Sequence, residues 1–161
     1  MRFFIILYML FFSFLSLFPE EDKEEAPVEI GYERYLGFSI EEAYKQFGSP
    51  DEVSVFRGEE AWQDDVIFFY EDFLSLFWYE NRVWQIRLDH RYDSEVYGLG
   101  MGIEKKPAAV ILGEKFGDPI FLDAISLIYR LPAGNIDYPV YVRFVFTEDR
   151  LSDLYIYRGD F

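Results

Sequence analysis

The chain has 161 residues, with 30 Asp and Glu against 15 Lys and Arg, a formal net charge of -15 at pH 7, no cysteine and one histidine. The acidity argues against nucleic-acid binding, and the missing cysteines exclude disulfides, thiol nucleophiles, cysteine-ligated zinc and acylation of an amino-terminal cysteine. Apolar residues make up 51% of the chain, so an acidic disordered protein is excluded as well.

Residues 3–18 form an uncharged apolar run that follows Arg2 and precedes an acidic segment. A basic residue before such a run is typical of a secretory signal. As a helix the run would be about 24 Å long, shorter than the roughly 30 Å hydrocarbon core of a bilayer. The sequence therefore predicts a signal peptide at residues 1–18, with an uncleaved hydrophobic segment as the alternative. We expect the folded part to be periplasmic or secreted.

Residues 19–35 are rich in Glu and Pro and lack a hydrophobic period, which is typical of an acidic linker. A helix is predicted at residues 40–47, because Ser39 and Glu42 have the spacing of a capping box. Gly48 and Pro50 then mark its end. Its apolar residues fall on one face, at Ile40, Ala43, Tyr44 and Phe47.

Apolar, β-branched and aromatic runs after this helix predict three strands and a short edge strand. The strands are residues 66–70, 74–79 and 83–88, and the edge strand is 53–56. The segment Glu80-Asn81-Arg82 is expected to turn the chain between two of them, because Asn tolerates the backbone of a tight turn.

The second half of the chain follows a glycine-rich junction at residues 98–102. Pro107 is expected at the first position of a helix, where its missing N–H is tolerated. This helix carries Ala108, Ile111, Leu112 and Phe116 on one face and ends at Gly117. The expected strands are residues 124–130, 140–146 and 151–157, with 120–122 as an edge strand and Glu148-Asp149-Arg150 as the second tight turn.

Alternation along the strands assigns each side chain to one of the two faces of a sheet. One face is apolar and is expected to pack on the helices; it contains Leu74, Leu76, Trp78, Ile86, Leu88, Val142, Phe144, Phe146, Leu154 and Ile156. The opposite face is aromatic and polar, and it becomes one continuous surface if the two sets of strands lie side by side. Trp84 is expected in the core with Trp78, from its position in the hairpin.

The two halves of the chain repeat one another. Phe47-Gly48-Ser49-Pro50 recurs as Phe116-Gly117-Asp118-Pro119, and Glu80-Asn81-Arg82-Val83 recurs at nearly the same spacing as Glu148-Asp149-Arg150-Leu151. Two landmarks at one spacing indicate an internal duplication. We therefore expect an α+β fold of two tandem repeats, 36–95 and 96–161. Each repeat is a short helix, or a helix pair, packed on an antiparallel sheet of three to four strands.

The segment from Gly37 to Pro50 resembles the opening motif of the BamE/SmpA-type outer-membrane lipoproteins, which has a glycine, a hydroxyl cap, an apolar helix and then Gly-x-Pro. The sheet hairpin of that family is similar to a later pattern here, Leu74-x-Leu76-x-Trp78, a polar turn, Val83 and Ile86. In tandem, the unit is similar in architecture to the beta-lactamase inhibitor proteins. The resemblance covers residues 36–157 and implies a non-catalytic binding domain of the envelope or the secreted fraction.

Catalytic chemistry has little support in the sequence. His90 lies between Asp89 and Asp93, which could orient it as an acid–base group, but no nucleophile motif accompanies it. Acidic pairs such as Asp64-Asp65 leave a carboxylate-based hydrolase, or a small-ligand- or cation-binding envelope protein, as alternatives. None has the spacing of a calcium loop, and solvated turns are the simpler interpretation. No catalytic residue, metal or cofactor is expected.

The aromatic and polar sheet face is the main candidate for function, because Tyr, Trp and Arg dominate the energetics of protein interfaces. Arginines placed among aromatics on an acidic protein favour a binding role. The expected partner-binding residues are Trp62, Phe77, Tyr79, Arg87, Tyr141, Arg143, Tyr155 and Tyr157. The sequence therefore predicts a protein-binding domain that is not an enzyme. Its partner would be a protein in the envelope or outside the cell, with membrane contact only through an uncleaved amino-terminal segment.

Overall fold

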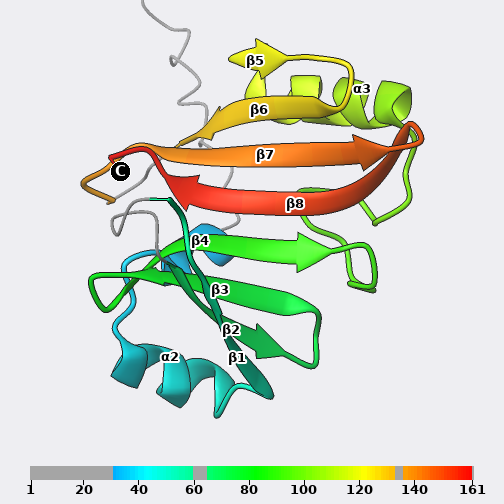
Figure 1. The fold of residues 1–161 in the computed structure, drawn as a ribbon. Coiled ribbons are helices and arrows are strands. Elements are labelled where there is room, and N and C mark those ends of the chain that lie inside the picture. Colours follow the sequence, from blue (N-terminus) through cyan, green and yellow to red (C-terminus); the bar gives the residue numbers. More distant parts are fainter. Residues whose placement is uncertain (1–30, 60–64, 133–135, 161) are drawn as a thin grey trace, which may run out of the picture.

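The computed structural model describes residues 31–59, 65–132 and 136–160. As predicted, the fold is α+β; the described residues form two α-helices and one antiparallel eight-stranded sheet (Figure 1). The helices are the 3-10 helix η1 (Tyr32–Tyr35), α2 (Ile40–Phe47) and α3 (Lys105–Phe116). The strands are β1 (Glu52–Phe56), β2 (Asp65–Tyr70), β3 (Leu74–Tyr79), β4 (Arg82–Asp89), β5 (Phe121–Leu122), β6 (Ser126–Leu131), β7 (Val140–Thr147) and β8 (Arg150–Arg158).

The predicted signal peptide at residues 1–18 lies outside the described residues. Among the residues that are described, no helix is long and apolar enough to cross a membrane.

The sheet is continuous from edge to edge, in the order β1-β2-β3-β4-β8-β7-β6-β5. Each half of the chain contributes four strands, and the two halves meet where β4 pairs antiparallel with β8. In Figure 1 this pair crosses the middle of the molecule, with β1 to β4 in green below and β5 to β8 in yellow to red above. The sequence left open whether the strands of the two halves lie side by side, and the structure shows that they do.

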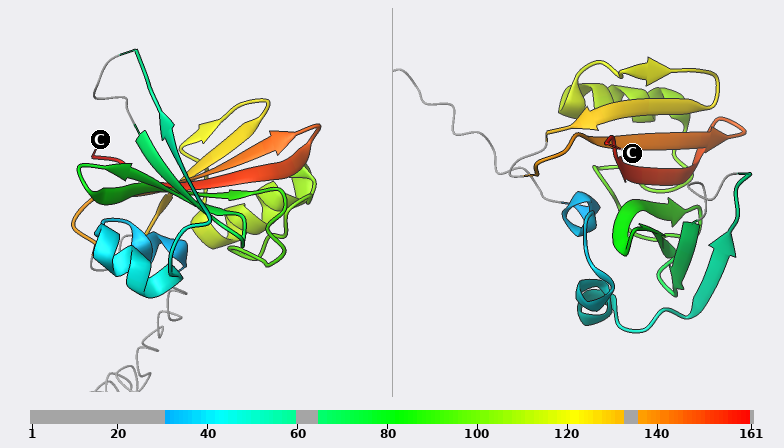
Figure 2. Two further views of the ribbon diagram at one scale, coloured as in Figure 1. Left: turned by 60° about the horizontal axis from the view of Figure 1, so that its bottom comes forward. Right: turned by 60° about the vertical axis from the view of Figure 1, so that its left-hand side comes forward.

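Both α-helices and η1 lie on one side of the sheet, and that side contains the hydrophobic core (Figure 2, left). All ten strand residues predicted for this face are buried, with exposed fractions of 5% or less. From the helices, Ala43, Ala108 and Leu112 complete the layer. Full burial of a Leu or Phe side chain contributes about 2 kcal/mol, so this layer is the main source of stability.

Helix α2 begins with the predicted capping box. The Ser39 hydroxyl accepts a hydrogen bond from the N–H of Glu42 at 3.3 Å, and the Glu42 carboxylate accepts one from the N–H of Ser39 at 2.8 Å. Gly48 ends the helix with a φ of 78°. The predicted apolar stripe is only half buried, because this short helix lies over the outer strands β2 and β3. Ile40 and Tyr44 therefore remain 38% and 43% exposed.

Helix α3 begins earlier than predicted. Its first residue is Lys105, so Pro107 occupies the third helical position rather than the first. The position tolerates proline because the first intrahelical hydrogen bond is donated one residue later, by the N–H of Ala108 to Glu104.

The turns explain where the strands begin and end. Both predicted hairpin turns have left-handed backbone at two residues each, Glu80, Asn81, Glu148 and Asp149. Strand β6 begins two residues later than predicted, at Ser126. The reason is that the Asp123 carboxylate accepts two backbone N–H groups, at 2.9 and 2.6 Å, and holds a turn there.

The folded body begins before residue 36, inside the segment predicted as a linker. Residues 32–35 form η1, and Tyr35 belongs to the core. Glu33 is buried, and its carboxylate accepts hydrogen bonds from the N–H of Gly31 at 3.0 Å and from the hydroxyl of Tyr97 at 2.7 Å. Burial and the charge of Glu33 raise the pKa of Tyr97 well above its ordinary value. This contact joins η1 to the segment that follows β4.

Candidate interaction surface

The side of the sheet opposite the helices carries the predicted aromatic and polar residues, and the described helices leave it uncovered (Figure 2, left). We call this surface the open face and define it by Phe77, Gln85, Arg87, Tyr141, Arg143, Tyr155 and Tyr157, all of which are partly exposed. The open face therefore includes six of the eight residues predicted to bind a partner.

Strand register arranges the open face in two rows. In the first row, β4, β8 and β7 place Arg87, Tyr155 and Arg143 directly opposite one another. The second row crosses β3, β4, β8 and β7 and contains Phe77, Gln85, Tyr157 and Tyr141. Side chains directly opposite each other in a sheet have Cβ atoms about 5 Å apart, so the rows form one contiguous patch. Two arginines thus flank a tyrosine near the centre of the sheet.

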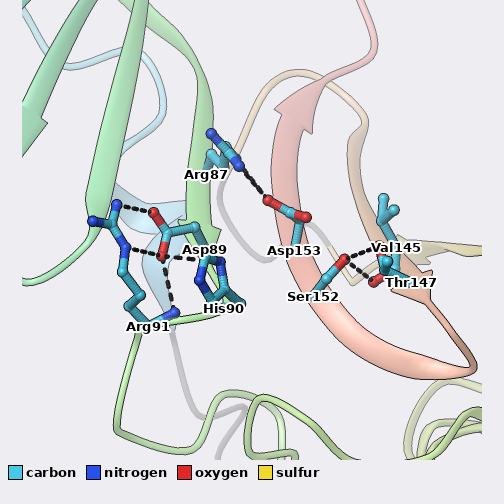
Figure 3. Close-up of polar contacts among 8 residues, drawn as sticks. All are labelled: Arg87, Asp89, His90, Arg91, Val145, Thr147, Ser152 and Asp153. Carbon is cyan, nitrogen blue, oxygen red and sulfur yellow. Dashed lines mark hydrogen bonds and ion pairs between the residues drawn. The ribbon is translucent and has the colours of Figure 1, made fainter.

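Arg87 is neutralised within the fold. Its Nε and Nη2 atoms donate hydrogen bonds to Asp153 Oδ1, at 2.8 and 2.5 Å (Figure 3). Its guanidinium carbon lies 5.8 Å from the centre of the Tyr155 ring. Partial burial acts to lower the pKa of Arg87. The hydrogen bond to Asp153 and the nearby negative charges act in the other direction and are stronger together, so the pKa is raised. Arg87 therefore lies beside the Tyr155 ring and offers little free charge.

Arg143 has a different environment. Its Nε is buried without a hydrogen-bond partner, and no carboxylate pairs with it within the described residues. Burial raises the pKa of both Tyr155 and Tyr157, and the charge of Arg143 opposes that rise. Both phenols therefore stay protonated at neutral pH and can donate hydrogen bonds. The buried Nε–H costs free energy while it is unpaired, and the rest of the Arg143 side chain is partly exposed.

A hollow of about 370 Å³ lies along the second row. It is lined by Trp84, Ile120, Ile128, Tyr141, Tyr157, Arg158 and Gly159. The rings of Tyr141 and Tyr157 lie 5.8 Å apart between their centres. Gly159 is required beside them, because a Cβ at that position would lie 2.1 Å from the Tyr141 ring. The hollow is an aromatic depression in the open face, next to Arg143.

The prediction that Trp84 lies in the core is wrong. Its side chain is partly exposed, its ring contacts Phe77, and its indole N–H donates to Asp65 Oδ1 at 2.9 Å. The ladder between β3 and β4 shifts register at this point, which leaves Trp84 as an extra residue of a β-bulge. The sequence contains a sign of this bulge. The apolar residues Val83 and Ile86 have two residues between them, whereas regular alternation along a strand would leave one.

Two residues predicted to bind a partner are not part of this patch. Tyr79 lies at the end of β3 and lines a separate cavity with Ile40 and Trp78. Trp62 lies outside the described residues. The structure therefore places Tyr79 apart from the two rows.

The residues considered for acid–base chemistry are exposed or engaged in ion pairs. His90 is exposed, and its Nδ1 lies 3.9 Å from Asp89 Oδ1 (Figure 3). Asp89 accepts hydrogen bonds from the side chain and backbone N–H of Arg91, which hold its pKa below the ordinary value. The pKa is also lowered at three other carboxylates, Glu42, Asp123 and Asp160. A carboxylate that acts as a general acid needs a raised pKa, so the lowered pKa values favour a structural role for these four residues.

Within residues 31–59, 65–132 and 136–160, no group of three or more His, Asp or Glu side chains is placed to hold a metal ion.

Comparisons with known proteins give a fold. No protein-family model matches the chain, and no curated protein matches it. Among solved structures, the chain is similar to an extracellular protein containing an SCP domain from Bacillus anthracis str. Ames, with a TM-score of 0.51 and 10% sequence identity. The match covers 89% of this chain and 50% of that chain, so the present chain spans half the length of that protein. At this identity the likeness shows a shared fold.

Proposed function

We propose that this chain is a non-catalytic binding protein that recognises another protein through the open face. The observation that carries the proposal is the row of Arg87, Tyr155 and Arg143, in register across three strands and uncovered by the described helices. Tyr and Arg are enriched among the residues that dominate interface energetics. A partner that excludes water from this row would strengthen its polar contacts, because the local dielectric constant falls.

The way in which the side chains are held also supports binding. Arg87 is fixed by Asp153, and Tyr141 is packed against Gly159 and the Tyr157 ring. Their strands β4, β7 and β8 are internal strands with a neighbour on each side. Side chains that are already ordered lose little conformational entropy when a partner binds, and the surface is therefore prepared for recognition.

A pair of double variants tests the proposal. One combines Arg143→Gln with Tyr155→Thr on the open face, and the other combines Lys106→Gln with Val110→Ala on the exposed surface of α3. Each pair removes one positive charge and shortens one side chain, and threonine keeps the strand propensity of the tyrosine position. We expect the open-face variant to recover its envelope or extracellular partner about ten-fold less well than wild type, while it still unfolds in one cooperative thermal transition. Equal recovery by both variants contradicts the proposal.

We also propose that the folded part acts in the periplasm or outside the cell. The apolar run at residues 3–18 after Arg2 supports export. The similar solved structure is described as extracellular, which agrees with this location. Mass spectrometry of the protein from each cell fraction tests it. The expected result is a chain outside the cytoplasm, shortened near residue 18 or retained intact in the membrane; an intact chain confined to the cytoplasm contradicts it.

We further propose that the two halves of the chain are tandem copies of one helix-plus-sheet unit, like the families that the sequence resembles. Several details occur in matched pairs. The glycines that end the two helices, Gly48 and Gly117, both have a φ of 78°. Arg82 and Arg150, each directly after its hairpin turn, donate to a backbone carbonyl ahead of the matching helix, at 3.2 and 2.9 Å. A duplication predicts that matched substitutions in the two halves change stability similarly, which chemical unfolding of variants at Gly48 and Gly117 measures.

A further inference from the structure

We propose that the partner places a carboxylate against Arg143, beside a large apolar side chain that fills the hollow lined by Trp84, Tyr141 and Tyr157. This inference rests on the proposed function, because it names the chemistry that the open face recognises. The occupant is a protein segment in which an Asp or Glu adjoins an aromatic or large aliphatic residue.

The fold leaves the guanidinium of Arg143 without a carboxylate partner among the described residues. Arg87 pairs with Asp153, and Arg158, at the rim of the hollow, pairs with Asp160 at 2.7 Å. Arg143 has no carboxylate partner within the described residues, and its Nε is buried without an acceptor. A carboxylate is the ligand that suits such a guanidinium best, because its two oxygens accept two parallel hydrogen bonds.

The hollow lies close to that guanidinium. Tyr141 and Arg143 are two residues apart on β7, so both side chains point to the open face with about 7 Å between their Cα atoms. Tyr157 lies directly opposite Tyr141 on β8 and closes the hollow from that side. A volume of about 370 Å³ is large enough for one bulky side chain. Neighbouring residues of one peptide segment can therefore reach both the hollow and the guanidinium.

The net charge of -15 limits the kind of partner that the open face can bind. A polyanion or a strongly acidic protein would be repelled by the surface as a whole. Charges more than about 8 Å apart are largely screened at physiological salt, so a single carboxylate touching Arg143 is attracted while remote repulsion stays small. The occupant is therefore a locally acidic segment of a protein that is neutral or basic overall.

A phage-displayed library of random dodecapeptides, selected on the secreted protein, tests this inference. We expect enrichment of peptides in which Asp or Glu adjoins a large apolar residue. Arg143→Gln should weaken the binding of these peptides about ten-fold or more, and Arg143→Lys, which keeps the charge without the planar fork, should weaken it less. Lys106→Gln is the matched control, because this exposed lysine lies on α3, on the other side of the sheet (Figure 2), and its loss changes the charge equally. The control should bind within about two-fold of wild type.

Enrichment of basic peptides, or no enrichment that depends on the open face, overturns the inference. Equal weakening by Arg143→Gln and Lys106→Gln overturns it too, because the effect would then be one of general charge. The two failures can be told apart. If the double variant Arg143→Gln with Tyr155→Thr loses its native partner but the peptides show no acidic preference, the proposed function stands and this inference fails. Thermal unfolding checks that each variant is folded.

Discussion

Glu33 is a buried carboxylate whose hydrogen bonds join the start of the folded body to its core. In Glu33→Ala the Tyr97 hydroxyl, which donates to Glu33 at 2.7 Å, stays buried without an acceptor. An unsatisfied buried polar group costs about 1–3 kcal/mol, so we expect a loss of that size in urea unfolding. Glu33→Gln keeps an acceptor and should lose less. Glu114→Ala, at an exposed position of α3, is the control, and an equal loss there contradicts this account.

Asp89 makes the stability of the fold depend on pH. Hydrogen bonds from Arg91 hold the pKa of Asp89 below its ordinary value of 3.8. A lowered pKa means that the stabilisation is complete above pH 3.8 and is lost as the pH falls through the folded-state value. The difference in stability between wild type and Asp89→Asn should therefore be present at neutral pH. It should shrink as the pH falls below 3.8. Thermal unfolding at several pH values measures it, and a difference that stays constant speaks against the ion pair.

At the scale of elements, alanine substitutions at three glycines distinguish the effect of backbone conformation on stability from the effect of side-chain packing. Gly48 and Gly117 end the two α-helices at a φ of 78°, and a Cβ at either position, or at Gly113 inside α3, would meet no atom within 4 Å. The cost of alanine at the two helix ends is therefore conformational, about 1–3 kcal/mol each. At Gly113, whose φ is not positive, alanine should stabilise the protein by about 0.5–1 kcal/mol. Chemical unfolding of the three variants tests the set, and destabilisation by Gly113→Ala would refute it.

The elements that could be predicted from the sequence are those with a local signal. The capping box at Ser39 and the alternation along the inner strands are of this kind, because each depends on neighbours in the chain. The bulges are different. Trp84 on β4 and Ser152 on β8 are extra residues in their ladders, and the extra residue alters the alternation. Ser152 occupies its bulge by donating a hydrogen bond to the carbonyl of Val145 at 3.2 Å (Figure 3).

The candidate site could be predicted in part, for the same reason. Alternation placed Arg87, Arg143 and Tyr155 on one face, as the structure has them. The difference between the two arginines is not a local property, because it depends on Asp153 lying on a strand from the other half of the chain. The hollow likewise depends on Gly159 packing against a distant ring.

At the scale of the whole molecule, the pairing of β4 with β8 joins two sets of four strands into one surface. The sequence indicated the two sets but not which edges would meet, because strand pairing is decided by packing between residues far apart in the chain. The pairing brings Arg87 and Tyr155 opposite one another, and the open face therefore exists only in the joined sheet. One side of the sheet contains the hydrophobic core, and the described helices leave the other side uncovered (Figure 2).

The central claim, that the open face binds a protein, is tested most directly by photo-crosslinking in living cells. A photoreactive residue, p-benzoylphenylalanine, is placed at the position of Tyr155 on the open face or at the position of Val110 on α3, which is 61% exposed. The proposed function predicts a distinct crosslinked protein from the Tyr155 position that is absent from the Val110 position. The same products from both positions, or no product from the Tyr155 position in a folded and exported chain, would contradict it.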